Sequence, residues 1–77
     1  MGLSSKTAKI IKDAEENGTP IFILTAKDKL AMETLDEYLM LCASNNCTSQ
    51  HTDDVKNRMD EFEEWQNNNQ DKVKLPD

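Results

Sequence analysis

The sequence predicts a mainly α-helical domain of three helices with one short strand or extended segment, assembled as an oligomer. Apolar residues recur at helical spacing in three stretches, a dense apolar run interrupts them at residues 21–24, and the chain has only 77 residues. A chain this short buries about 60% of the surface that it exposes when unfolded, so a disulfide, a metal or a partner subunit usually supports it. We therefore treat residues 1–77 as one small domain, with residues 71–77 as a C-terminal tail.

The first predicted helix runs from Ser4 or Ser5 to about Asn17. Either serine is a suitable N-terminal cap. Gly18 readily adopts the left-handed conformation that ends a helix, and Pro20 cannot continue one. The apolar face of this helix is thin and consists of Leu3, Thr7, Ile10, Ile11 and Ala14.

The apolar run Ile-Phe-Ile-Leu at residues 21–24 is short, β-branched and aromatic. It predicts a strand or an extended segment over residues 21–25. Alternate side chains of an extended chain point to opposite faces, so the run needs burial on both sides or contact with another subunit. A strand here also needs a hydrogen-bonding partner, either the tail segment 72–75 or the same segment of a second copy.

The second predicted helix begins near Asp28 and ends at Ser44 or Asn45, with Thr25 or Asp28 as its cap. Its broad apolar face contains Ala31, Met32, Leu35, Tyr38, Leu39 and Cys42, whereas Leu30, Met40 and Leu41 lie toward the other side. A helix that is apolar on two sides is normally buried on two sides. This pattern indicates a subunit interface.

The third predicted helix follows a polar turn at residues 45–50, is capped by Ser49 or Thr52, and continues to about Asn68. Its stripe consists of Val55, Met59, Phe62 and Gln66, with Arg58 and Trp65 beside it.

The charge distribution is acidic and uneven. The formal net charge is −6, and residues 28–77 hold five basic against twelve acidic residues. Nucleic-acid binding needs clustered Lys and Arg, so we expect no nucleic-acid partner. The N-terminus has no apolar signal core and no stretch approaches the ~18 apolar residues of a membrane span, which predicts a cytoplasmic protein with reduced thiols and no membrane partner.

Cys42, Cys47 and His51 are the soft metal ligands of the chain. A structural zinc site needs four ligands, so Asp53 or Asp54 would have to complete the set. We instead expect Cys42 in the core and Cys47 as a loop thiol, with no metal and no cofactor. His51 lacks an orienting third group and an oxyanion loop, and the two glycines form no phosphate loop, so we expect no enzyme activity.

The corner Thr25-Ala26-Lys27-Asp28-Lys29 places a hydroxyl, two ammonium groups and a carboxylate where the extended segment meets the second helix. Backbone N–H groups at a helix start attract anions. Two subunits paired through residues 21–24 would line one cleft with two such corners, and Phe22, Tyr38 or Trp65 would offer a stacking surface. The alternative is that Asp28 only caps the helix and the lysines are only solvated. The candidate ligand-binding residues are Phe22, Thr25, Lys27, Asp28, Lys29 and Trp65.

The stretch PIFILTAKDKLA, together with the later FEEWQ and DKVKLPD, resembles a group of short proteins from phages, prophages and related mobile elements. These proteins carry a PxFxLxAxDxLA-like stretch, a Trp in the last helix and a KLPD-like ending. The resemblance covers Pro20 to Asp77, and no reaction is assigned to the group. Many relatives have Arg where this chain has Thr25, which weakens an argument from a basic residue at that position.

The resemblance implies a phage-type accessory protein that acts by binding in the host cytoplasm. The first hypothesis is an oligomeric sequestering protein, or sponge, for a small anionic or nucleotide-type host defence signal. The alternative is an acidic inhibitor or adaptor that covers a basic surface of a host protein, with the acidic residues of its third helix (Asp53, Asp54, Asp60, Glu61, Glu63 and Glu64).

Overall fold

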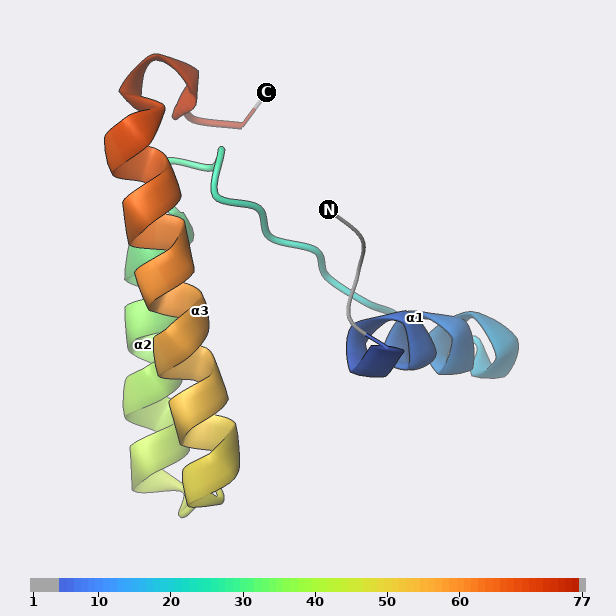
Figure 1. Ribbon diagram of the computed structural model, residues 1–77. Helices are drawn as coiled ribbons and strands as arrows, with labels where there is room; N and C mark the ends of the chain where they lie inside the picture. Colours follow the sequence, from blue (N-terminus) through green and yellow to red (C-terminus); the bar gives the residue numbers. More distant parts are fainter. Residues whose placement is uncertain (1–4, 77) are drawn as a thin grey trace.

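The computed structural model describes residues 5–76 and is mainly helical (Figure 1). Its elements are α1 (Ser5–Asn17), α2 (Ala31–Ser44), α3 (Ser49–Asn68) and the short 3-10 helix η1 (Gln70–Lys72). The three predicted helices are confirmed, and no sheet forms among the described residues. None of these helices is long and apolar enough to cross a membrane. The expected cap Ser4, the apolar Leu3 and the final Asp77 lie outside the described residues.

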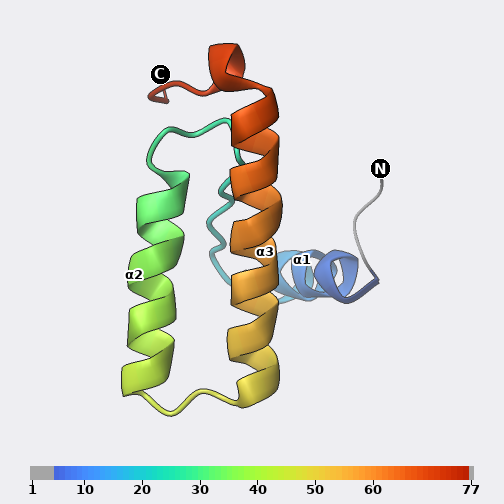
Figure 2. The ribbon, with the colours of Figure 1, turned by 60° about the vertical axis from the view of Figure 1, so that its left-hand side comes forward.

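Helices α2 and α3 form an antiparallel hairpin, with α1 to one side (Figure 2). Ala31 is 0% exposed and Cys42 is 3% exposed on α2, and Val55 is buried on α3. The rest of the predicted faces is half-buried and consists of Met32, Leu35, Leu39, Met59, Phe62 and Gln66. Tyr38 is the exception on the hairpin, since it stays exposed, and on the predicted face of α1 Ala14 is buried but Ile10 is 55% exposed. Helical spacing therefore identified most of the packed surface correctly.

The start of α2 differs from the prediction. The helix begins at Ala31, three residues after Asp28, with Leu30 at the N-cap and no side-chain cap. The Asp28 Oδ1 atom accepts a hydrogen bond from the Leu30 N–H at 2.8 Å, and the Asp28 N–H donates to the Thr25 carbonyl at 3.1 Å. Asp28 thus closes a local turn, a role that Asp often takes in competition with helix formation.

The cap of α3 also differs. Thr48 occupies the N-cap, and its Oγ1 atom accepts a hydrogen bond from the His51 N–H at 3.2 Å. The two predicted caps, Ser49 and Thr52, both lie inside the helix. Several hydroxyl residues follow one another here, so the residue type alone did not fix the first helical position.

Helix α1 ends in a Schellman motif. Gly18 adopts a positive φ of 65°. The Thr19 N–H donates to the Ala14 carbonyl at 2.9 Å, and the Gly18 N–H donates to the Glu15 carbonyl at 3.5 Å. These two bonds satisfy carbonyl groups of the last turn, and a positive φ costs little at glycine. The expected stop at Gly18 is confirmed.

Helix α2 ends in the same motif, with asparagine in the place of glycine. Asn46 has a φ of 58°. The Cys47 N–H donates to the Cys42 carbonyl at 3.0 Å, and the Asn46 N–H donates to the Ala43 carbonyl at 3.5 Å. Asparagine tolerates the left-handed region better than most residues, so it reverses the chain between α2 and α3.

The segment that links α1 to α2 crosses between them without regular structure (Figure 1). Residues 21–25 form no strand and no helix. The tail does pair, but with the corner: Asp28 and Lys74 form a single parallel bridge within the described residues. Phe22 is 83% exposed and Ile23 is 69% exposed. The dense apolar run therefore finds little cover within one chain.

Candidate functional site

The tail holds the corner at residues 25–29 through main-chain hydrogen bonds. The Lys29 N–H donates to the Lys74 carbonyl at 2.9 Å, and the Lys74 N–H donates to the Lys27 carbonyl at 3.0 Å. This pair of bonds places the backbones of Lys29 and Lys74 next to each other. Two ammonium groups from distant parts of the sequence thereby reach the same end of the hairpin.

A glutamine on α3 completes the anchoring of the corner. The Gln66 Nε2 atom donates to the Ala26 carbonyl at 3.0 Å and to the Asp28 carbonyl at 3.4 Å. Both bonds are partly buried, and the Asp28 carbonyl also accepts from the Ala31 N–H at 3.0 Å, so the loss of Gln66 mainly costs the Ala26 carbonyl its hydrogen bond. The corner is consequently held from α3 on one side and from the tail on the other.

An open cavity of about 720 Å³ lies between the corner, the end of α3 and the tail. It is lined by Lys29, Gln66, Asn67, Gln70, Val73, Lys74 and Leu75. Within residues 5–76, neither Lys29 nor Lys74 takes part in an ion pair, and the same holds for Lys27. The cavity thus combines two unpaired cations, three side-chain amides and an apolar edge, which is a suitable set for an anion attached to an apolar or aromatic group.

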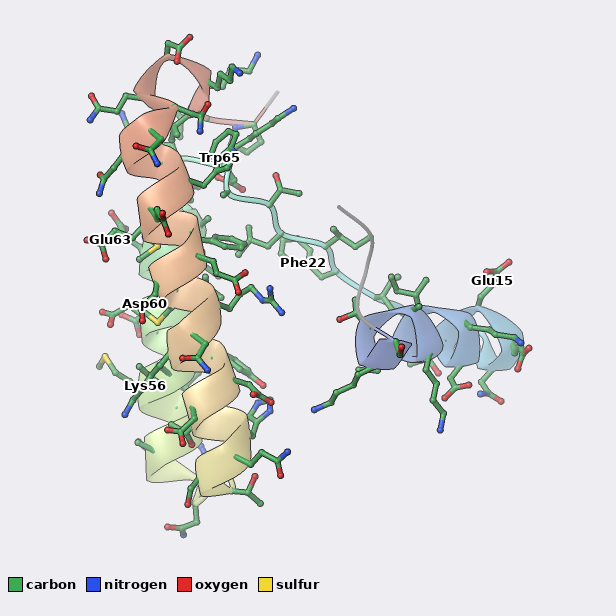
Figure 3. The ribbon with its side chains drawn as sticks, viewed as in Figure 1. Glu15, Phe22, Lys56, Asp60, Glu63 and Trp65 are labelled. Carbon is green, nitrogen blue, oxygen red and sulfur yellow. The ribbon has the colours of Figure 1, made fainter. Side chains whose placement is uncertain are left out.

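The structure brings one predicted site residue, Lys29, to this cavity. Asp28 closes the turn and does not line the cavity. Thr25 and Lys27 are exposed on the corner and do not line it either. Trp65 is half-buried at the end of α3, whereas Phe22 lies further along the linking segment (Figure 3).

Six lining residues were not predicted: Gln66, Asn67, Gln70, Val73, Lys74 and Leu75. The alternation of polar and apolar residues at 72–75 marked the tail as a pairing segment, and Gln66 lay on the stripe of α3. The position of Gln66 inside an apolar stripe was the signal that could have identified it as a site residue, because an amide in a packed face needs hydrogen-bond partners.

A second group of polar side chains lies on the hairpin face toward α1. The Tyr38 hydroxyl and the His51 Nε2 atom are 2.9 Å apart, and the two rings meet edge to face with centroids 5.9 Å apart. Partial desolvation, and next the neighbouring Cys42, raise the pKa of the Tyr38 phenol above its usual value, although the side chain is exposed. A cavity of about 670 Å³ separates this face from α1, and Lys6 of α1 reaches across to Asp54 at 3.7 Å.

The cysteines are both free thiols, with Cys42 buried and Cys47 exposed. Among the described residues, no three His, Cys, Asp or Glu side chains lie close enough together to hold a metal ion. Cys42 lies in the packed face of α2 and Cys47 in the turn, as the sequence predicted.

Known proteins provide no assignment for the cavity or the corner. No protein-family model, no curated protein and no solved structure matches this chain.

Proposed function

We propose that this chain is a non-catalytic, phage-type accessory protein that assembles with copies of itself and sequesters a small anionic or nucleotide-type host defence signal. The observation that carries the proposal is the cavity at the corner, where Lys29 and Lys74 lie together without an acidic partner among residues 5–76. Unpaired cations beside amide donors bind phosphate well, because charge-assisted hydrogen bonds are the strongest that side chains make.

The surface of the single chain supports the assembly. Its accessible area is 6474 Å². A compact protein of 8.8 kDa is expected to expose about 4,800 Å². The excess is on the order of 1,700 Å², about twice what one partner buries in a standard interface. The radius of gyration of 13.8 Å likewise exceeds the roughly 11.5 Å of a compact domain of this length.

Exposed apolar residues mark the surfaces that an assembly would cover. They lie on α1 (Ile10), on the linking segment (Ile21, Phe22 and Ile23), at the N-cap and on the exposed side of α2 (Leu30, Tyr38, Met40 and Leu41) and on the tail (Leu75). In the proposed assembly, Phe22, Thr25 and Lys27 of one copy complete the cavity of another. Lys29 and Lys74 contact phosphate, and an aromatic ring stacks on a base.

Calorimetric titration with a panel of cyclic and ADP-ribose-type nucleotides tests the proposal. We expect one class of nucleotide to bind, and the double variant Lys29→Ala/Lys74→Ala to lose at least about tenfold in affinity. Lys56→Ala/Lys72→Ala is the matched control, because it removes the same charge from two exposed lysines that do not line the cavity. Absence of binding across the panel, or equal loss in both double variants, would refute a phosphate site at the corner.

The acidic alternative has one specific observation in its favour. Asp60, Glu63 and Glu64 line a hollow of about 380 Å³ on α3, together with Asn67 and Asn68. Asp60 and Glu63 follow Lys56 along one side of the helix (Figure 3). A basic host surface would bind here, and Asp60→Lys/Glu64→Lys would then abolish capture of host proteins in a pull-down. Capture that survives this charge reversal would count against the alternative.

A further inference from the structure

The Schellman motif at the end of α2 places the two cysteines of the chain at its paired positions. Cys42 is the residue whose carbonyl accepts the long-range bond, and Cys47 is the residue whose N–H donates it, at 3.0 Å. Side chains at these two positions commonly contact each other in this motif. At the end of α1 the same positions hold Ala14 and Thr19, so the pairing of two thiols is particular to the α2–α3 turn.

The backbone geometry is compatible with a disulfide. With an N···O distance of 3.0 Å between Cys47 and Cys42 and standard bond lengths, their Cα atoms lie at most about 6.9 Å apart. Disulfides join Cα atoms that are roughly 4.4–6.8 Å apart. Hydrogen bonding to the Cys42 side chain raises the pKa of the Cys47 thiol, so the reactive thiolate forms at a higher pH than for an ordinary cysteine.

The exposure of the two thiols differs, which assigns them different roles. Cys47 is exposed in the turn, whereas Cys42 is 3% exposed in the face that packs against α3. A dissolved oxidant therefore reaches Cys47 first. Cys42 is the other thiol of the chain, and the backbone bond holds its residue next to Cys47.

We propose that Cys42 and Cys47 form a reversible disulfide when the protein meets hydrogen peroxide. The Cys47 thiolate attacks one peroxide oxygen, the O–O bond breaks, and the products are a Cys47 sulfenic acid and, after protonation, water. The Cys42 sulfur then attacks the Cys47 sulfur, its proton and the hydroxyl leave as a second water, and the S–S bond forms. Two thiols are oxidised and one peroxide is reduced.

The cross-link joins the last turn of α2 to the residue before Thr48, the cap of α3. It therefore closes the turn of the hairpin covalently, at the end of the molecule opposite the C-terminal tail (Figure 2). The disulfide stabilises the fold by restricting the unfolded chain.

Intact-mass spectrometry of the full chain provides the test. After hydrogen peroxide, quenching and alkylation under denaturing conditions, we expect a monomer that has lost two hydrogen atoms and takes up no alkylating agent. Dithiothreitol should restore both alkylation sites. The melting temperature of the oxidised protein should rise by roughly 5 °C or more. Disulfide-linked dimers as the main product, or added oxygen on Cys47 with Cys42 still alkylated, would overturn the proposal.

Variants of Asn46 test the role of the motif. Asn46→Gly keeps the positive φ and should oxidise at the rate of the wild type. Asn46→Val disfavours it and should lower the rate of disulfide formation at least about tenfold. Circular dichroism checks that both variants keep their helices. Equal rates in the two variants would show that the motif does not position the thiols. Cys42→Ser is the control that should gain no thermal stability from peroxide.

Discussion

Two regions of the molecule can be compared: the hairpin of α2 and α3, and the N-terminal region, which consists of α1 and its linking segment. Both contain the same helix-ending motif, but they bury their side chains to very different extents. Both α1 and α2 end in a Schellman motif, at Gly18 and at Asn46. The hairpin buries Ala31, Cys42 and Val55 between its helices, whereas the linking segment leaves Phe22 and Ile23 largely exposed. Local chain reversals therefore form in both regions, whereas among residues 5–76 the packing of one α-helix on another joins α2 to α3, and α1 contributes Ala14 as its buried residue.

The difference indicates where further subunits would add stability. A large exposed apolar patch is typical of an interaction surface. The N-terminal region meets the hairpin across a cavity, and the Lys6–Asp54 ion pair is exposed, so it adds little to stability. The comparison can be tested by substitutions on each side.

The largest expected effect comes from Ile23→Asp in the linking segment. If this segment forms the subunit interface, a buried isoleucine becomes a desolvated charge, and the concentration for half-assembly should rise by about 100-fold. Light scattering over a dilution series measures this change. Ser5→Asp on α1 is an exposed control and should leave the assembly unchanged. An unaltered assembly in Ile23→Asp would exclude the segment from the interface.

A smaller effect is expected in the hairpin. Ala31 is 0% exposed, so Ala31→Leu overpacks the contact between α2 and α3 and should lower the free energy of unfolding by about 1–3 kcal/mol. Ala43→Leu makes the same change at an exposed position of α2 and should stay within about 0.5 kcal/mol. Urea unfolding followed by circular dichroism measures both. Equal effects would mean that Ala31 has room around it.

The smallest effect is expected from Gly18→Ala. No heavy atom lies within 4 Å of the position that a Cβ would take at Gly18, so the penalty comes only from the positive φ of 65° and is about 1 kcal/mol, confined to the end of α1. Hydrogen exchange should show faster exchange of the Gly18 and Thr19 amides and no change in α2 and α3. Faster exchange in the hairpin as well would show that the two regions unfold together.

The sequence predicted the helices well because helical spacing is a local property. It placed the end of α3 at Asn68 and identified the packed face of α2, with Tyr38 as the exception. It missed the start of α2, because the Asp28 side chain closes a turn in place of capping the helix. A short Asp side chain accepts hydrogen bonds from nearby N–H groups both when it caps a helix and when it closes a turn. The residue type therefore does not tell which of the two structures forms.

The candidate site was harder to predict because it depends on contacts between distant residues. Lys74 is 45 positions from Lys29 in the sequence, and the bond between their backbones has no sequence signature. The corner was correctly singled out as polar, but its cavity is built mainly from the end of α3 and the tail. Phe22 and Trp65 were chosen for their rings, and neither lines that cavity.

The anchoring of the corner has a consequence for how the site tolerates variation. The bonds from the tail join main-chain atoms of Lys27, Lys29 and Lys74, and the bonds from Gln66 end on main-chain carbonyls. The shape of the corner is thus largely independent of the side chains at positions 25, 27, 29 and 74. Substitutions at these four positions are therefore expected to change the chemistry that the corner presents, while Asp28 and Gln66 preserve the same frame.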